Sequence, residues 1–428
     1  MSVLALPAAA CGCSNEDVSE GLLSIDEALS LIDDAVYQAV DSELLATAKA
    51  NGRCLAQPIV AQDQHPLFDN SAMDGFAVRT VDLRGCGPWK LPVTDQVFAG
   101  GHALIPVSSN AVQVFTGAPI PGGCDAVIAQ EDVVKQGDFI GVAVRPRFGQ
   151  HIRRAGEDIR RSEIIAKSGT LLNPRTIAAA ATVGAATVNV WRKIRVAIMI
   201  TGCEVTAQAC HLDKGSIHDT NGPMLTALLD RSGVEVSAIE WLGDNLKEQA
   251  DKILALAGNA DLLVTTGGVS VGKADHVKSA FTQMGGHITF SGVAIKPGKP
   301  ISFGKIGDTH WLGLPGNPVS AFVTWSLFGE AILDKVMGRT KTNSNRRLVV
   351  TDQDLHHRPG RCEFRFANLK GLDGLGREIV DCCDAMHSAR MAPMLNSDGL
   401  VSIPADIETL PKGSIVEYTP HRNICARQ

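Results

Sequence analysis

Several patterns that identify common classes of protein are missing from this sequence. None of its 11 cysteines forms a Cys-x-x-Cys pair, so we expect free reduced thiols rather than a zinc or iron–sulfur site. It has neither the Gly-x-x-x-x-Gly-Lys-Ser/Thr loop of P-loop proteins nor the Gly-x-Gly-x-x-Gly turn of dinucleotide-binding folds. Lys and Arg number 40 against 46 Asp and Glu, and this lack of basic excess disfavours a nucleic-acid-binding protein.

No segment is suited to crossing a membrane or to directing export. The longest run of small apolar residues, Thr176–Trp191, is too short and too rich in Gly, Thr and Asn to span a bilayer. The apolar opening, MSVLALPAAACGC, has no basic residues ahead of it and is short, so we do not expect a secretory leader. The sequence therefore predicts a cytoplasmic protein without membrane contact.

The length of 428 residues, together with changes in the pattern of apolar, Pro and Gly residues along the chain, predicts several domains. We expect residues 1–20 to be disordered and residues 21–60 and 149–190 to form a helical and mixed linking domain. Short β-rich pieces separated by Pro and Gly predict a β-rich insert at 61–148. Alternating strands and helices predict an α/β domain at 191–340, and short strands predict a C-terminal β-barrel at 346–428.

Helix signals are clearest in the linking domain. Ser24 followed by Glu27 forms a potential capping box, and the apolar spacing after it predicts one or two helices over Ser24–Gly52. Asn173 as a cap with Pro174 at the first helical position predicts a second helix start.

The α/β domain is expected to hold a doubly wound, mostly parallel sheet covered by helices on both faces. Ligands of such sheets bind at the carboxyl ends of the strands. Three loops follow predicted strands there: Thr201–Glu204, Asp219–Asn221, and TTGGVSVGKAD, which contains Gly267, Gly268, Ser270 and Asp275. Together they offer an anion cradle of glycine amides and acids that suit Mg²⁺ bound to phosphate oxygens. Each loop alone fits ordinary turn chemistry, but three at one sheet edge favour a ligand site.

Further motifs have both a functional and an ordinary interpretation. Lys296 and Lys299, on a loop with two prolines, suit an anion held between two ammonium groups, or are solvated surface lysines. Pro315 and Pro318 fit a rigid pocket wall or a simple strand-to-helix connection. The Asp-rich stretch before Asp74 fits Asx turns. RRAGEDIRR, residues 153–161, fits a salt-bridged surface or an oxyanion site.

These motifs, in this order, resemble the family of MoeA-type molybdopterin molybdenumtransferases, which includes the E domain of gephyrin. The matching pieces are FDNSAMDGFAVR, FTGAPIPGGCDAV, RRAGED, TGCEV, TTGGVSVGKADHV, AIKPGKP, LPGNPVSA and, more loosely, GRCEFRFANL. The resemblance implies a linking part, a β insert, a molybdopterin-binding α/β domain and a C-terminal β-barrel. It implies a homodimer in which the insert of one chain faces the α/β pocket of the other.

The resemblance also implies a reaction and its participants. Adenylylated molybdopterin and molybdate give molybdenum cofactor and AMP, with Mg²⁺ assisting. Further implied partners are the molybdopterin adenylyltransferase and the apo-enzymes that receive the cofactor. Two other hypotheses stay open: a non-catalytic pterin-binding scaffold, and adenylylation of molybdopterin itself, which the insert and the barrel disfavour.

Site residues follow from the resemblance only where motifs match. The implied catalytic residues are Asp74, Thr116, Glu204, Asp244, Asp275 and Lys296. The implied substrate-binding residues are Asp219, Asn221, Gly267, Gly268, Ser270, Lys296, Lys299, Pro315 and Pro318. Glu204 and Asp275 are the implied metal ligands, and Ser388 lies near a serine-containing loop of the family. The sequence departs from the family pattern at Cys203, Lys273 and Gly292.

Overall fold

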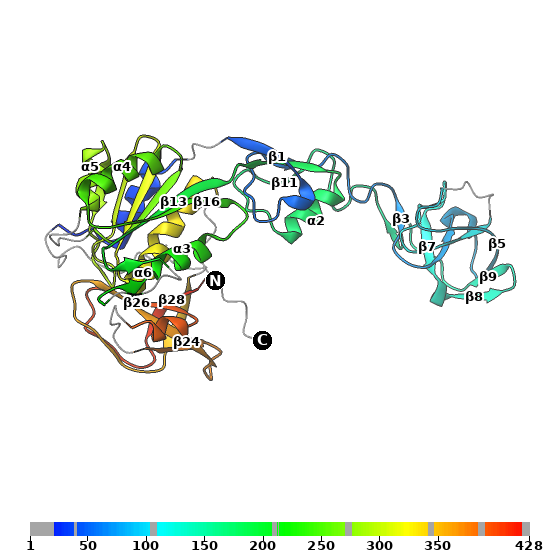
Figure 1. The fold of residues 1–428 in the computed structure, drawn as a ribbon. Helices are drawn as coiled ribbons and strands as arrows, with labels where there is room; N and C mark the ends of the chain where they lie inside the picture. The colour runs from blue at the N-terminus through cyan, green and yellow to red at the C-terminus, as the bar shows by residue number, and fades with distance from the viewer. Residues whose placement is uncertain are drawn as a thin grey trace.

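The protein was analysed as a computed structural model that describes residues 21–37, 41–102, 109–207, 212, 214–269, 276–340, 346–383 and 390–421. The first twenty residues, Ser270, Lys273, Asp275 and Ser388 lie outside the described residues. The chain is elongated (Figure 1). An α/β unit and a β-barrel lie at one end, a β insert lies at the other, and a small mixed unit joins them.

The α/β unit is built on a six-stranded sheet with the order β16-β13-β17-β21-β20-β18. Its strands are β13 (Ile194–Thr201), β16 (Val234–Leu242), β17 (Leu262–Thr266), β18 (His287–Ser291), β20 (Ser302–Ile306) and β21 (Thr309–Leu314). The first four in the sheet order are parallel, whereas β20 and β18 are antiparallel to their neighbours. The predicted doubly wound sheet is confirmed, with an antiparallel edge and a strand, β18, that the sequence analysis did not identify.

Helices cover both faces of this sheet because successive side chains of a strand point to opposite faces. The helices are α1 (Ile25–Ala35), α3 (Asn221–Leu229), α4 (Leu246–Ala257), α5 (Val277–Gln283), α6 (Pro318–Thr324) and α7 (Glu330–Val336). Val196 and Ile198 of β13 share a core with α1, α3, α6 and α7. Ala197 and Met199 of the same strand share a second core with α4 and α5. The near-continuous apolar sequence of β13 therefore reflects burial on both faces.

The helical segment that follows β21 is interrupted. A π-helical turn, Trp325–Gly329, separates α6 from α7. Glu330, the first residue of α7, is buried and accepts hydrogen bonds from the indole Nε1 of Trp325 at 3.1 Å and from the Arg231 guanidinium at 2.8 and 3.0 Å. This ion pair ties the turn after α3 to the interrupted helix.

The amino-terminal part corrects the helix predicted over Ser24–Gly52. The Ser24–Glu27 capping box is present, and α1 begins at Ile25, but the helix ends at Ala35. Residues Ser42–Ala46 instead form strand β1, which pairs antiparallel with β12 (Thr187–Trp191). Tertiary pairing with a distant segment therefore overrides the local helical pattern. Helix α1 packs on α7, so it shares the core of the α/β unit, although the sequence grouped it with the linking domain.

The linking unit has its own small core. Strand β1 pairs with β12, and β2 (Ile59–Val60) pairs with β11 (Ile164–Ala166). Helix α2 (Pro174–Thr182) begins at the predicted Asn173 cap, whose side chain accepts from the backbone of Arg175 and Thr176. Two chain passages, paired as β3 (Asn70–Ser71) and β10 (Ile152–Arg153), lead to the insert.

The insert is a six-stranded sheet with the order β7-β4-β6-β5-β9-β8. Its strands are β4 (Gly75–Val78), β5 (Trp89–Val97), β6 (Ala111–Val114), β7 (Ala126–Ala129), β8 (Val133–Gln136) and β9 (Phe139–Val142). Apolar side chains fill two clusters of its own, so the insert is a separate β unit.

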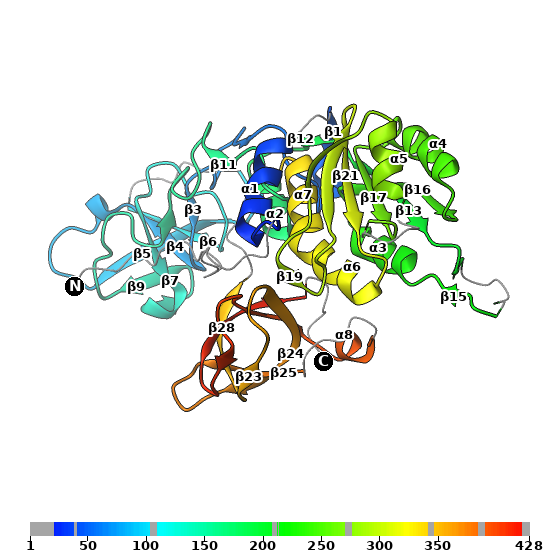
Figure 2. The same cartoon turned by 90° about the vertical axis from the view of Figure 1, so that its left-hand side faces the viewer.

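The C-terminal unit is a closed β-barrel, as predicted. Its strands are β22 (Arg347–Thr351), β24 (Cys362–Leu372), β25 (Glu378–Cys382), β26 (Gly399–Ile403) and β28 (Ile415–Pro420). They follow the order β24-β25-β22-β28-β26, and pairing of β26 with β24 closes the barrel. A short segment of the α/β unit, β19 (Ile295–Lys296), adds to β24 in parallel (Figure 2). Among the described helices, none is long and apolar enough to cross a membrane.

The Glu330 ion pair gives the first prediction. Glu330→Ala should lower the free energy of unfolding by about 2–3 kcal/mol, because it leaves Arg231 and the Trp325 indole without their shared acceptor. Glu378→Ala, which removes an exposed partner of Arg347 on the barrel, is the control and should cost less than about 1 kcal/mol. Equal losses in urea unfolding would contradict the role given to Glu330.

A buried histidine gives a pH prediction. His310 in β21 is 2% exposed, and burial, aided by the charge of Lys305, lowers its pKa to about 4. The unfolded chain therefore takes up a proton between its ordinary pKa near 6.5 and about 4, while the folded chain does not. Stability is fully present above this range and falls as the pH drops through it, by on the order of 3 kcal/mol. His310→Gln should lessen the slope of urea-derived stability between pH 6.5 and 4, where His421, whose pKa is also lowered by burial to about 4, supplies the remaining part. An unchanged slope would refute the assignment.

Candidate functional site

A cavity of about 350 Å³ lies where the carboxyl ends of β13, β17 and β21 meet. Sequence motifs separated by more than 100 residues converge on it. The predicted residues that line it are Glu204, Asp219, Asn221, Asp244, Gly267, Gly268, Pro315 and Pro318. The described residues thus bring together most of the set expected in the α/β domain.

The paired glycines allow the strand ends to approach closely. Gly267 and Gly268 have φ values of 84° and 62°, which side chains rarely tolerate. A Cβ on Gly267 would lie 2.7 Å from the carbonyl oxygen of Thr201, at the end of β13. The Gly267 N–H donates to the Leu314 carbonyl at the end of β21 at 3.1 Å. Gly267 is therefore the point at which three strands meet.

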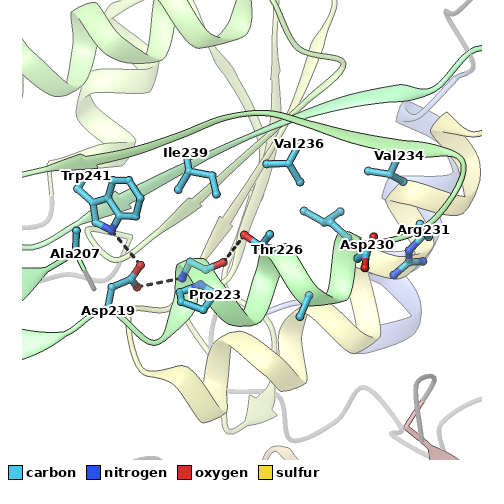
Figure 3. Close-up of a pocket in the computed structure, with 13 residues that line it drawn as sticks. Ala207, Asp219, Pro223, Thr226, Asp230, Arg231, Val234, Val236, Ile239 and Trp241 are labelled. Carbon is cyan, nitrogen blue, oxygen red and sulfur yellow. Dashed lines mark hydrogen bonds between the residues drawn. The ribbon is translucent and has the colours of Figure 1, made fainter. Parts of the chain in front are cut away.

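Asp219 and Asn221 form one wall of the cavity at the start of α3. The buried Asp219 carboxylate accepts from the Gly222 N–H and from the Trp241 indole Nε1, each at 3.0 Å (Figure 3). One oxygen of Asp219 thus fixes the helix start, and the other connects it to Trp241 of β16. The Asn221 amide donates to the Gly316 carbonyl at 2.8 Å, but its own buried oxygen has no partner among the described residues. Since buried acceptors are normally satisfied, this oxygen is available to a donor in the cavity.

Glu204 and Asp244 bring further carboxylates to the lining of the cavity. The Asp244 carboxylate accepts from the Cys203 backbone N–H at 3.4 Å, and the Cys203 sulfur accepts from the Asp244 N–H at 3.2 Å. The thiol at position 203 thus takes part in a reciprocal contact that orients Asp244. Gly202, with a φ of 136°, leaves room for the Glu204 side chain, whose oxygen would lie 2.7 Å from a Cβ there.

These two carboxylates fit the expected Mg²⁺. No group of three or more His, Cys, Asp or Glu with metal-binding geometry occurs in the part of the chain that the structure describes. Mg²⁺ commonly takes only one or two protein carboxylates and completes its shell with phosphate and water. Glu204 and Asp244 meet that requirement, whereas Asp275, the other predicted ligand, lies outside the described residues.

The two predicted lysines are not among the described residues that line the cavity, and they have different surroundings. Pro300, at the end of their loop, lines the cavity. Lys296 is partly buried, and its Nζ donates to Glu363 of the barrel at 3.0 Å. Lys299 is exposed, and no ion pair to it occurs among the described residues. Gly292, a position where the family pattern has lysine, has a φ of 101°, and Leu22 occupies the place of its missing Cβ.

Asp74 and Thr116 lie in the insert and not at this cavity. The Asp74 carboxylate accepts from the backbone N–H and the hydroxyl of Thr116 at 2.7 and 2.8 Å, and these bonds lower its pKa. The insert lies at the far end of the chain from the cavity (Figure 1). Within one chain, these two residues therefore form a separate, exposed pair.

Sequence reasoning missed some of the lining. His218, Thr220, Pro300 and Gly316 also face the cavity. Each is next to or inside a motif that was identified, so adjacency was the available signal. A Cβ on Gly316 would lie 3.3 Å from the Gly267 Cα, so the β21 loop packs on the glycine pair.

A larger groove of about 660 Å³ lies next to the cavity, between α3 and the edge strand β16. Val234, Val236 and Ile239 give it an apolar wall, and Trp241 is 41% exposed at one end (Figure 3). Asp219 borders both spaces. The groove therefore leaves apolar surface of the sheet edge uncovered in the single chain.

Comparisons with known proteins agree with this architecture. Residues 23–184 match the MoeA N-terminal region (domain I and II), and residues 197–335 match a probable molybdopterin binding domain. A molybdopterin molybdenumtransferase of Haemophilus influenzae is 36% identical over 80% of this chain and 85% of its own length. The chain belongs to the MoeA family. A second relative, the molybdopterin molybdenumtransferase of Synechococcus elongatus, is 37% identical over 92% of this chain and 99% of its own length.

Solved MoeA structures share the fold. A molybdopterin biosynthesis MoeA protein from Pyrococcus horikoshii OT3 is 30% identical and matches with a TM-score of 0.81 over 94% of this chain and 100% of its own. A second MoeA structure from the same species gives 27% identity and a TM-score of 0.77 over 93% and 99% of the two chains. The MoeA arrangement therefore extends over nearly the whole chain.

The glycine pair gives a prediction for the site. Gly267→Ala should cost about 1–3 kcal/mol of stability, because alanine is strained at this φ and its Cβ meets the Thr201 carbonyl. The displaced strand end should also weaken binding in the cavity. Gly374→Ala, in an open barrel turn, is the matched control and should behave as wild type. Thermal melts and AMP titrations of both variants test this prediction. A Gly267→Ala variant with the stability and AMP affinity of the wild-type protein would contradict the close approach.

Proposed function

We propose that the chain inserts molybdenum into adenylylated molybdopterin, giving molybdenum cofactor and AMP from molybdate. The observation that supports this best is the cavity at the strand ends. It combines backbone at paired glycines, three carboxylates and proline walls in one place. Relatives named molybdopterin molybdenumtransferase cover most of the chain at 36–37% identity.

Each group in the cavity has a suitable task in that reaction. The Gly267 N–H is bonded to Leu314 and the Gly222 N–H to Asp219. The backbone at Gly268 and the rest of the first turn of α3 are therefore the parts that would favour an anionic phosphate, since amides there carry partial positive charge. Asp219 fixes the start of α3 through Gly222. Glu204 and Asp244 would hold Mg²⁺, which withdraws charge from a phosphoanhydride when it is bound. Asp275 and Ser270 complete the proposed set from the adjoining loop.

Molybdate is a dianion, so it suits the lysine loop beside Pro300. Lys299 is exposed and has no acidic partner among the described residues. Its ammonium is therefore free to pair with an oxyanion. Lys296 supplies a second positive charge a short distance along the same loop. In this proposal the two lysines hold molybdate, the family motif implies a further contact from Ser270, and no covalent bond to the protein is required.

We further propose that the chain acts as a homodimer. Asp74 and Thr116 then approach the α/β cavity of the second copy, as the family resemblance implies. The long separation of insert and cavity within one chain supports this arrangement. The apolar groove between α3 and β16 supplies surface that a second copy could cover, although its exposed Trp241 side chain is already oriented by Asp219. We place this reaction in the cytoplasm.

The reaction can be followed by AMP release. Purified protein with adenylylated molybdopterin, molybdate and Mg²⁺ should release AMP only when molybdate is present. Glu204→Gln should reduce the rate by about 100-fold, because it removes a charged metal ligand at the reacting phosphate. Glu248→Gln, an exposed acid on α4, is the control and should retain full activity.

The alternatives give different results in the same assay. Tight binding of the adenylylated pterin without AMP release would indicate a pterin-binding scaffold. ATP-dependent transfer of AMP to free molybdopterin would indicate the adenylyltransferase. Either outcome would overturn the proposed function.

A further inference from the structure

The loop that carries the two lysines is held by the C-terminal barrel. Strand β19 pairs in parallel with β24, so that Ile295 is opposite Cys362 and Lys296 is opposite Glu363. The Cys362 N–H donates to the Ala294 carbonyl at 2.9 Å. The loop therefore adds a strand to the barrel although it belongs to the α/β unit.

Glu363 is a buried acid at this junction. Its side chain is 1% exposed, and each carboxylate oxygen has a cationic partner. One oxygen accepts from Lys296 Nζ at 3.0 Å, and the other accepts from Arg365 Nε at 2.9 Å. Burial opposes ionisation of Glu363, but the hydrogen bonds from Lys296 and Arg365 outweigh it and lower its pKa. The carboxylate is therefore charged at neutral pH.

The cluster around Glu363 is tightly enclosed. The Arg365 side chain is 5% exposed and also donates to the His356 carbonyl. The His357 ring is fully buried 3.9 Å from Glu363. An ammonium that bonds to a carboxylate in such surroundings has few positions available to it. Lys296, which is 37% exposed, therefore has a fixed inner contact and an open outer side.

The loop is also fixed from the side of the α/β unit. Gly298 has a φ of 116°, and a Cβ there would collide with Thr324 of α6. The Val293 N–H donates to the Lys299 carbonyl at 3.0 Å. The backbone of the loop is thus fixed by α6 on one side and by β24 on the other. Of its two lysines, Lys296 is the one whose ammonium bonds to a carboxylate among the described residues, that of Glu363.

We propose that Glu363 of the barrel is a positioning residue for molybdate, because it fixes the direction of the Lys296 ammonium while the outer side of that lysine stays open. This inference rests on the proposed function. The two lysines then have unequal tasks. Lys299 provides an uncompensated charge that attracts the anion, and Lys296 provides a donor whose direction is fixed in advance by Glu363. Pre-fixed donors lose less freedom when a ligand binds.

A double-mutant cycle tests the coupling. Glu363→Gln should raise the KM for molybdate roughly tenfold and leave the KM for adenylylated molybdopterin within about twofold, because only the donor for molybdate is released. Lys296→Met should also raise the KM for molybdate. In the Lys296→Met protein, adding Glu363→Gln should cause no further rise, since Glu363 acts through Lys296.

Two results would overturn the proposal. If the effects of Glu363→Gln and Lys296→Met multiply, Glu363 does not act through Lys296. If Glu363→Gln lowers the KM for molybdate, the carboxylate competes with the anion instead of positioning its donor. A wild-type protein that releases no AMP in response to molybdate would instead refute the proposed function, so the two failures are distinguishable.

Stability controls separate positioning from folding. Glu363→Gln leaves Arg365 without a charged partner, so thermal melts are recorded for each variant. Glu363→Asp keeps the charge, so its KM for molybdate should lie closer to the wild-type value than that of Glu363→Gln. It also serves as the test variant if Glu363→Gln is too unstable to assay. Glu378→Gln, on the barrel surface, should leave both KM values unchanged. A Glu363→Asp protein that folds well but shows the molybdate KM of Glu363→Gln would contradict the charge-based role.

Discussion

The candidate site depends on the close contact between Gly267 and the end of strand β13. A glycine at the end of β17 lets the backbone pass within van der Waals distance of the Thr201 carbonyl and still bond to the end of β21. Any Cβ there would push the strand ends apart. Because those ends carry the loops with Glu204, Asp244 and Pro315, the shape of the cavity follows from this one approach. The positive φ values of both glycines show that the backbone itself forms this wall.

A second constraint joins the site to the barrel. Strand β19 lies within the sequence of the α/β unit, but its hydrogen bonds are made to β24 of the barrel. The loop of Lys296 and Lys299 is consequently placed by two units at once. This arrangement gives the C-terminal barrel a direct link, through Glu363, to the loop that we propose binds molybdate.

Much of the fold could be predicted because its signals are local. The apolar run of β13, the Asn173 cap and the glycine pair after β17 each lie within a few neighbouring residues, and the order of motifs indicated the family. Strand β1 could not be predicted, because its partner β12 is about 140 residues away and only that pairing overrides its helical pattern. The role of Glu363 was likewise hidden, since an acid in a barrel strand meets Lys296 only through the parallel pairing of β19 with β24.

The most direct test of the account is to locate the bound substrate. A crystal structure of the protein with adenylylated molybdopterin and Mg²⁺ would show where the phosphates lie. The account predicts density for them at the ends of β13, β17 and β21, against Gly267 and Gly268, with Asn221 in contact with the ligand. Density in the groove between α3 and β16 alone, with the glycine cavity empty, would contradict it.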